Sequence, residues 1–152
     1  MGRISKENYY LDIAETVLER ATCLRRVYGA IIVKNDEIIS TGYNGAPRGR
    51  RNCVDMGYCT RERLQVPRGE RYELCRSVHA EANAITKVAK SANNCDGSTL
   101  YITAAPCIEC SKLIIQAGIK RVVYADDYRS EEGLDLLRRV GIECVQYRID
   151  RT

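Results

Sequence analysis

The chain has 152 residues, a length that suits one compact domain and is too short for two ordinary ones. Its composition, with 45% hydrophobic residues, 29% charged residues and only three prolines, excludes a disordered or collagen-like protein. No apolar run approaches the roughly 20 residues of a membrane-spanning helix, and the first ten residues are polar rather than signal-like. The formal net charge of +4 only slightly favours an anionic ligand.

The pattern of the first 41 residues predicts a helix followed by a β-hairpin. Apolar residues recur at helical spacing over residues 6–21. Two short apolar runs then follow, at 30–33 and 37–41, and Asn35-Asp36 separates them. Such a pair of residues between two apolar runs is typical of a tight turn that joins two antiparallel strands.

An irregular, cysteine-rich insert over about residues 45–76 interrupts this periodicity. A structureless stretch of this length is unusual inside a small domain unless something fixes it. The insert is also rich in arginine, which predicts either a solvated charged loop or a phosphate-binding surface, because guanidinium groups match phosphate oxygens. The sequence does not select among these arginines, which are Arg48, Arg50, Arg51, Arg61, Arg63, Arg68, Arg71 and Arg76.

The second half of the chain alternates helices and strands. Helices are predicted over 79–90, 106–117 and 131–140, and strands over 99–103, 121–125 and 142–149. Three strands joined by two helices form a βαβαβ unit, whose right-handed crossovers give a parallel half-sheet. Together with the hairpin, this unit predicts a single domain over residues 1–152, an α/β protein with a three-layer α/β/α sandwich and a five-stranded mixed sheet.

Eight cysteines and a single histidine are the most informative part of the composition. Because the sequence shows no secretory signal, we expect a cytoplasmic protein whose thiols stay reduced. Cysteines that are spaced in pairs then indicate metal ligands more readily than disulfides.

One cysteine pair, Cys107 and Cys110, lies at the start of a predicted helix, directly after Pro106. Residues three apart share one helix face, so both sulfurs can reach the separation of about 3.8 Å that tetrahedral zinc requires. The positive end of the helix also favours the thiolate form. Two thiolates leave two zinc positions open, so a third ligand has to come from elsewhere in the chain.

The only histidine, His79, opens the preceding helix and is the candidate third ligand. Three protein ligands leave one position for water, which is the arrangement of catalytic zinc, and zinc lowers the pKa of that water to about 7. Glu81 follows two residues later and is placed to move protons between water and substrate without binding the metal. A His-x-Glu motif combined with Pro-Cys-x-x-Cys is typical of zinc deaminases that act on cytosine or adenine.

A second set of cysteines lies in the insert and just after the first helix. A four-thiolate zinc would fix the insert and replace the core that it lacks, whereas ordinary reduced thiols are the other interpretation. The candidate ligands are Cys23, Cys53, Cys59 and Cys75. The remaining two cysteines, Cys95 and Cys144, lie near apolar positions and are expected to be buried free thiols.

Three motifs together resemble the deoxycytidylate (dCMP) deaminase family. They are Gly-Tyr-Asn-Gly-Ala-Pro at 42–47, Cys-Arg-Ser-Val-His-Ala-Glu at 75–81 and Pro-Cys-Ile-Glu-Cys at 106–110. The resemblance implies a cytidine-deaminase-like fold and the hydrolytic conversion of dCMP to dUMP and ammonia, with zinc as cofactor. It further implies the following roles: zinc ligands His79, Cys107 and Cys110, proton shuttle Glu81, and substrate-binding residues Asn44 and Tyr128.

The same resemblance implies a second, structural zinc, which members of the family often carry, on the four cysteines named above. It also implies a homo-oligomer, a hexamer in many relatives, that dCTP activates and dTTP inhibits. Two residues depart from the family pattern near the nucleotide or effector region: Tyr28 replaces a small aliphatic residue and Asn52 replaces a frequent histidine.

Two alternatives remain open from the sequence. The first is another deaminase of the same fold, which acts on tRNA adenosine or another nucleobase, because such enzymes share the metal site. The shared metal site does not separate these substrates, but the cysteine-rich insert and the motif at 42–47 favour a mononucleotide, and the mild charge disfavours RNA. The second alternative is a non-catalytic zinc module that binds nucleic acid, which would have no use for Glu81.

Overall fold

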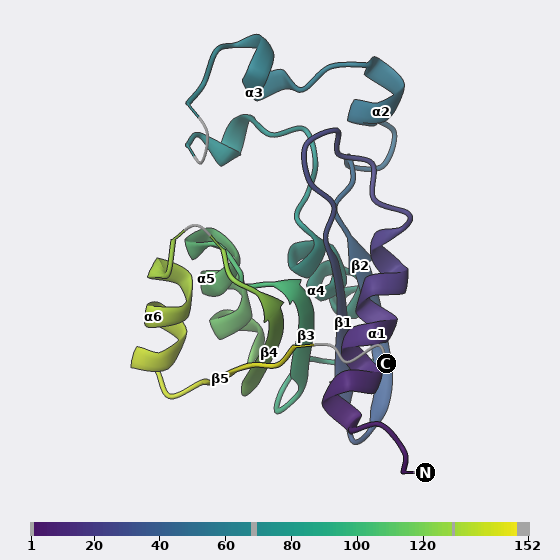
Figure 1. The fold of residues 1–152 in the computed structure, drawn as a ribbon, viewed down its shortest axis with the longest axis vertical. Coiled ribbons are helices and arrows are strands. Elements are labelled where there is room, and N and C mark those ends of the chain that lie inside the picture. The colour runs from purple at the N-terminus through teal and green to yellow at the C-terminus, as the bar shows by residue number, and fades with distance from the viewer. Residues whose placement is uncertain (1, 68–69, 129, 149–152) are drawn as a thin grey trace.

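The structure is a computed structural model that describes residues 2–67, 70–128 and 130–148. A five-stranded mixed sheet in the order β2-β1-β3-β4-β5 forms its centre (Figure 1). The strand β1 is antiparallel to both of its neighbours, β2 and β3, whereas β3, β4 and β5 run parallel. The strands are β1 (Gly29–Lys34), β2 (Glu37–Tyr43), β3 (Thr99–Ala104), β4 (Arg121–Asp126) and β5 (Glu143–Gln146).

Helices cover both faces of this sheet, so the predicted three-layer sandwich is confirmed (Figure 1). Helix α1 (Lys6–Leu18) packs Leu11 and Ala14 onto one face, against Ile31 and Val123. The other face carries α4 (Ala80–Ala89), α5 (Ile108–Ala117) and α6 (Glu132–Arg139), whose apolar side chains share one core cluster with Ile102. Apolar periodicity thus predicted the strands and the helices that pack on the sheet.

The predicted hairpin turn is confirmed in its detail. Asn35 and Asp36 both adopt positive φ angles, of 52° and 62°, as a two-residue hairpin turn of the mirror-image type requires. The first helix ends at Leu18 rather than at residue 21. The residues that follow form hydrogen bonds that span three residues instead of four, such as that from the Ala21 N–H to the Leu18 carbonyl. The last strand is shorter than predicted, and residue 149 lies outside the described residues.

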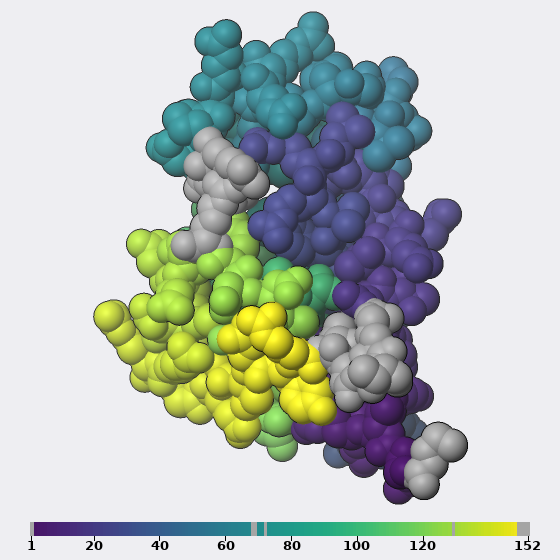
Figure 2. Space-filling view, in the orientation of Figure 1, coloured from purple at the N-terminus to yellow at the C-terminus, as the bar shows by residue number. Residues whose placement is uncertain are grey.

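The insert is irregular, as predicted, but it contains short helices that the sequence did not indicate. These are α2 (Cys53–Met56), α3 (Thr60–Arg63) and the 3₁₀ helix η1 (Tyr72–Leu74). The insert is drawn in teal and covers one end of the molecule, beyond the ends of the strands (Figures 1 and 2). An isolated bridge between Gly45 and Val78 ties its two ends together, directly before α4 begins.

None of the helices within the described residues combines the length and the apolarity that a bilayer crossing requires.

Candidate metal centre

The starts of two neighbouring helices place the three predicted zinc ligands. His79 is the N-cap residue of α4 and Cys107 is the N-cap residue of α5, and both have extended backbone angles. The two helices therefore begin one or two residues later than predicted, because both ligands are N-cap residues just outside the helix. Cys110 lies in the first turn of α5, and its N–H donates to the Cys107 sulfur at 3.4 Å. The sulfur thus caps the helix as a side-chain oxygen would.

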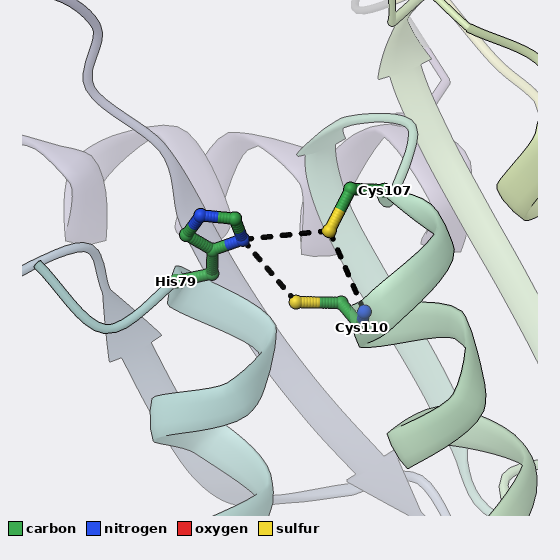
Figure 3. Close-up of side chains that lie close together, drawn as sticks. All are labelled: His79, Cys107 and Cys110. Carbon is green, nitrogen blue, oxygen red and sulfur yellow. Dashed lines mark hydrogen bonds between the residues drawn. The ribbon is translucent and has the colours of Figure 1, made fainter. Parts of the chain in front are cut away.

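The three side chains converge on one point (Figure 3). The Nδ1 atom of His79 lies 3.5 Å from Sγ of Cys107 and 3.3 Å from Sγ of Cys110. A tetrahedral zinc bound at ordinary lengths requires nitrogen-to-sulfur separations of about 3.5 Å. Within the described parts of the chain, this is the one set of three or more histidine, cysteine or acidic side chains close enough to hold a metal ion.

Electrostatics favours a thiolate at this point. The hydrogen bond from Cys110 lowers the pKa of the Cys107 thiol to about 4, although burial opposes this shift, and the bond with His79 lowers it further. The same pairing, together with burial, raises the pKa of Cys110. Burial lowers the pKa of His79, but the bond with Cys107 and the charge of Glu81 outweigh it, so this pKa is raised overall. The thiolate is the form of cysteine that binds metals.

Glu81 lies beside this centre and is almost fully enclosed, with 5% of its surface exposed. Burial raises the pKa of its carboxyl group, and the charge of His79 partly offsets this effect. A raised pKa makes the carboxylate a stronger base, as a group that transfers protons between water and substrate requires.

A cavity of about 350 Å³ connects the centre with the insert and brings the predicted substrate-binding residues to it. His79, Glu81 and Cys107 line its inner end, and both Asn44 and Tyr128 contribute to its wall. The cavity has a size typical of sites for small molecules. The structure therefore gathers the residues of three separate motifs at one place.

Asn44 also has a structural role, which the sequence did not reveal. Its Oδ1 atom accepts a hydrogen bond from the Tyr28 N–H at 2.8 Å, and its Nδ2 atom donates to the Arg26 carbonyl at 2.8 Å. The buried side chain therefore fixes the loop before β1, which forms part of the cavity wall. One donor hydrogen and one lone pair of the amide are left over for a ligand.

The second cysteine set is only loosely assembled. Cys23, Cys59 and Cys75 line the same cavity, and Cys53 is buried beside the Ser77 hydroxyl at 4.0 Å. Burial raises the pKa of the Cys53 thiol, and the nearby thiols of Cys23 and Cys59 raise it further. All eight cysteines of the chain are free thiols. Among the described residues, however, no three of these four sulfurs lie within the 4.8 Å that encloses the first set.

Three arginines also line the cavity, and sequence reasoning singled out none of them. They are Arg25 and Arg26 in the loop before β1 and Arg61 in α3. The sequence does not show which of the eight arginines of the insert is buried, because a single buried charged residue produces no periodic pattern of apolar residues. Of those eight, Arg68 lies outside the described residues.

Comparisons with known proteins agree with this geometry. Residues 4–126 match the family described as the cytidine and deoxycytidylate deaminase zinc-binding region. The chain is 38% identical to ComE operon protein 2 of Bacillus subtilis, over 99% of this chain and 75% of that protein. It is 35% identical to the deoxycytidylate deaminase of Schizosaccharomyces pombe, over 95% of this chain but only 45% of that longer protein.

A solved structure is similar over nearly the whole chain. The dCMP deaminase of cyanophage S-TIM5, crystallised in complex with dCMP and dUMP, superposes with a TM-score of 0.77 at 36% sequence identity. The match covers 95% of this chain and all of that one. The motifs, the fold and the family match agree, and the chain belongs to the zinc-binding cytidine and deoxycytidylate deaminase family.

Proposed function

We propose that this protein converts dCMP and water to dUMP and ammonia at a zinc ion that His79, Cys107 and Cys110 hold. The observation that carries the proposal is the approach of the His79 imidazole nitrogen to two sulfurs, at 3.5 and 3.3 Å, beside a buried glutamate in a cavity. One nitrogen and two sulfurs are a donor set that zinc favours, and the separations fit it. Three protein ligands leave a position open toward the cavity.

Zinc at this place would lower the pKa of a water molecule to about 7 and so supply a nucleophile for the C4 atom of cytosine. Glu81 accepts the proton of that water and delivers it to N3 of the ring, which makes C4 more electrophilic. It then takes the remaining proton of the former water from the hydroxyl group on C4 and transfers it to the amine, so that the C4–N bond breaks, ammonia leaves and the C4 carbonyl of dUMP forms. Its burial keeps the carboxyl group away from bulk water while it exchanges these protons.

Similarity to named relatives supports dCMP as the substrate. The S. pombe relative is a deoxycytidylate deaminase, and the cyanophage structure holds dCMP and dUMP. In this chain, Asn44 and Tyr128 line the cavity in front of Glu81 and are the proposed substrate contacts. A buried glutamate at the metal centre also favours an enzyme over a zinc module that only binds nucleic acid.

The test is to measure ammonia release from dCMP, deoxycytidine, dCTP and a tRNA stem-loop under the same conditions. We expect rapid release from dCMP, and we expect a chelator to abolish it and added zinc to restore it. Release from the tRNA alone would assign the protein to the other substrate class, and salt-sensitive RNA binding without ammonia would assign it to the non-catalytic class.

We also propose a second, structural zinc on Cys23, Cys53, Cys59 and Cys75. Its support is that these four thiols surround one region of the insert, and that the insert has little apolar core of its own. The expected metal content is two zinc ions per chain. Replacing Cys59 with serine should leave one zinc ion and full occupancy of the catalytic site, whereas one zinc ion in the unmodified protein would exclude the second site.

The remaining proposals concern organisation. We propose a single domain over residues 1–152 that forms a homo-oligomer, with a hexamer as the candidate assembly, in the cytoplasm, with dCTP as activator and dTTP as inhibitor. Exposed large apolar side chains around the insert support association, among them Leu24 and Leu64. Sedimentation of the purified protein with and without each triphosphate tests both the oligomer and the effectors.

A further inference from the structure

The wall of the cavity that the insert and the loop before β1 provide is rich in positive charge. Arg25, Arg26 and Arg61 all line it, and the acidic side chain of Glu62 lies beside Arg25. A pyrimidine nucleotide whose ring reaches Glu81 must place its phosphate group away from the metal centre. A dianionic phosphate in a partly enclosed cavity needs a cation with several donors.

Two of these arginines are engaged elsewhere or stand in solvent. Arg25 forms an ion pair with Glu62, whose carboxylate lies 3.1 Å from its Nε atom. Arg26 is exposed and lies over the ring of Tyr28, 5.2 Å from the ring centroid. The Arg25 side chain is partly enclosed, with 21% of it exposed, but it is already paired with a carboxylate, and Arg26 is not enclosed.

Arg61 differs from both in its burial. Only 7% of its surface is exposed, although it lines the cavity. Its Nη1 atom donates to the Glu70 carbonyl at 3.1 Å, which fixes the orientation of the guanidinium plane. The positive charge of Arg61 acts on the side chains of both Cys75 and His79, so the guanidinium lies within electrostatic reach of the metal centre.

A neighbour on the same helix provides the contrast. Arg63, two residues further along α3, is exposed and stacks over the Tyr58 ring at 4.3 Å. It lines a neighbouring depression, which shares Leu24, Cys59 and Glu62 with the cavity of the metal centre, but Arg63 itself does not line that cavity. One short helix therefore presents one arginine to the cavity and another to solvent.

We propose that Arg61 binds the 5′-phosphate of the substrate and so makes the enzyme prefer a nucleotide to the corresponding nucleoside. The inference rests on the proposed deamination of dCMP and names a specificity-determining residue for it. The planar guanidinium can donate two parallel hydrogen bonds to phosphate oxygens, and burial strengthens the attraction between the charges. Because its orientation is already fixed, little conformational freedom is lost when the phosphate binds.

The experiment compares binding of dUMP and of deoxyuridine to the zinc-loaded protein and to its variants, alongside the kinetics with dCMP. For Arg61→Gln we expect the affinity for dUMP and the kcat/KM for dCMP to fall by about tenfold to a hundredfold. The affinity for deoxyuridine should stay within about twofold, because that ligand carries no phosphate. Arg61→Lys keeps the positive charge but loses the two parallel hydrogen bonds of the guanidinium. It should therefore lose less affinity for dUMP than Arg61→Gln does, and its affinity for deoxyuridine should not change.

Arg63→Gln is the matched control and should bind dUMP as the unmodified protein does. Equal losses of dUMP and deoxyuridine affinity in both Arg61 variants would show that Arg61 only supports the cavity wall. Unchanged dUMP affinity in either folded variant would also overturn the proposal. A failure of the proposed function looks different, because the unmodified protein would then release no ammonia from dCMP.

Discussion

The sheet-and-helix body and the insert hold their functional side chains by different means. In the body, the ligands His79 and Cys107 cap helices that are anchored in a core where Ile102 and Ile114 are almost completely buried. In the insert, the regular elements span three or four residues, and large apolar side chains such as Val54 are half exposed.

The buried side chains of the insert are of another kind. Among the side chains of the insert that the structure describes, they are thiols and a guanidinium, namely Cys53, Cys59 and Arg61, rather than aliphatic groups. Polar groups of this kind stabilise a structure only when metal ions, hydrogen bonds or ligands satisfy them. The catalytic centre thus depends on apolar packing, whereas the cavity wall that the insert provides depends on polar contacts. Substitutions in the two regions should therefore have different consequences.

The largest effect is expected from Cys110→Ser, which removes one of three metal ligands. We expect the variant to lose the catalytic zinc and all measurable ammonia release, because serine is a poor zinc ligand at neutral pH. Metal analysis and an ammonia assay measure both. Cys144→Ser, at a half-buried thiol on β5, is the control and should keep full activity. A Cys110 variant that retained turnover would remove this residue from the metal centre.

Glu81→Gln should leave the zinc content and the fold unchanged but lower kcat by about 10²–10⁴-fold. Glutamine keeps the size of the side chain and cannot accept the proton of the attacking water. Glu109→Gln, at an exposed position in the first turn of α5, is the matched control and should be active. Near-normal turnover of the Glu81 variant would refute the proton-transfer role.

The same contrast explains how much the sequence could predict. The spacing of apolar residues predicted every strand of the sheet, and the motifs around His79 and Cys107 predicted the metal centre, because ligand spacing follows directly from helix geometry. The helices of the insert span four residues or fewer and are too short to show a period. The burial of Arg61 and the bonds from Asn44 to the loop before β1 depend on contacts distant in the chain, which one sequence does not reveal.

Removal of apolar volume should destabilise the body strongly. Ile114 in α5 is fully buried under the sheet, so Ile114→Ala should lower the free energy of unfolding by about 2–5 kcal/mol. Leu113→Ala is the comparison on the same helix, where 45% of the leucine is exposed, and it should cost far less. Urea denaturation of both variants measures the difference. Equal losses in the two variants would contradict the described packing of α5.

Asn44→Ala should have an intermediate effect at the junction of the two regions. The change leaves the Tyr28 N–H and the Arg26 carbonyl without their partner, at a cost of about 1–3 kcal/mol each if they stay dry. Because the released loop lines the cavity, we also expect a higher KM for dCMP. Asn93→Ala, at an exposed position, is the control for both urea denaturation and kinetics. Unchanged stability together with a raised KM would assign Asn44 to substrate binding alone.

The smallest effect is expected from Val54→Ala on α2, where 53% of the side chain is exposed. If the insert is held by polar contacts rather than by apolar packing, the free energy of unfolding should change by less than about 0.5 kcal/mol. Val88→Ala removes the same atoms from a side chain that is 2% exposed in α4, and should cost about 2 kcal/mol. Urea denaturation of the two variants compares the same Val→Ala change at an exposed position and at a buried one. A loss at Val54 as large as that at Val88 would show that the Val54 side chain is buried in solution, for instance against a second copy of the chain.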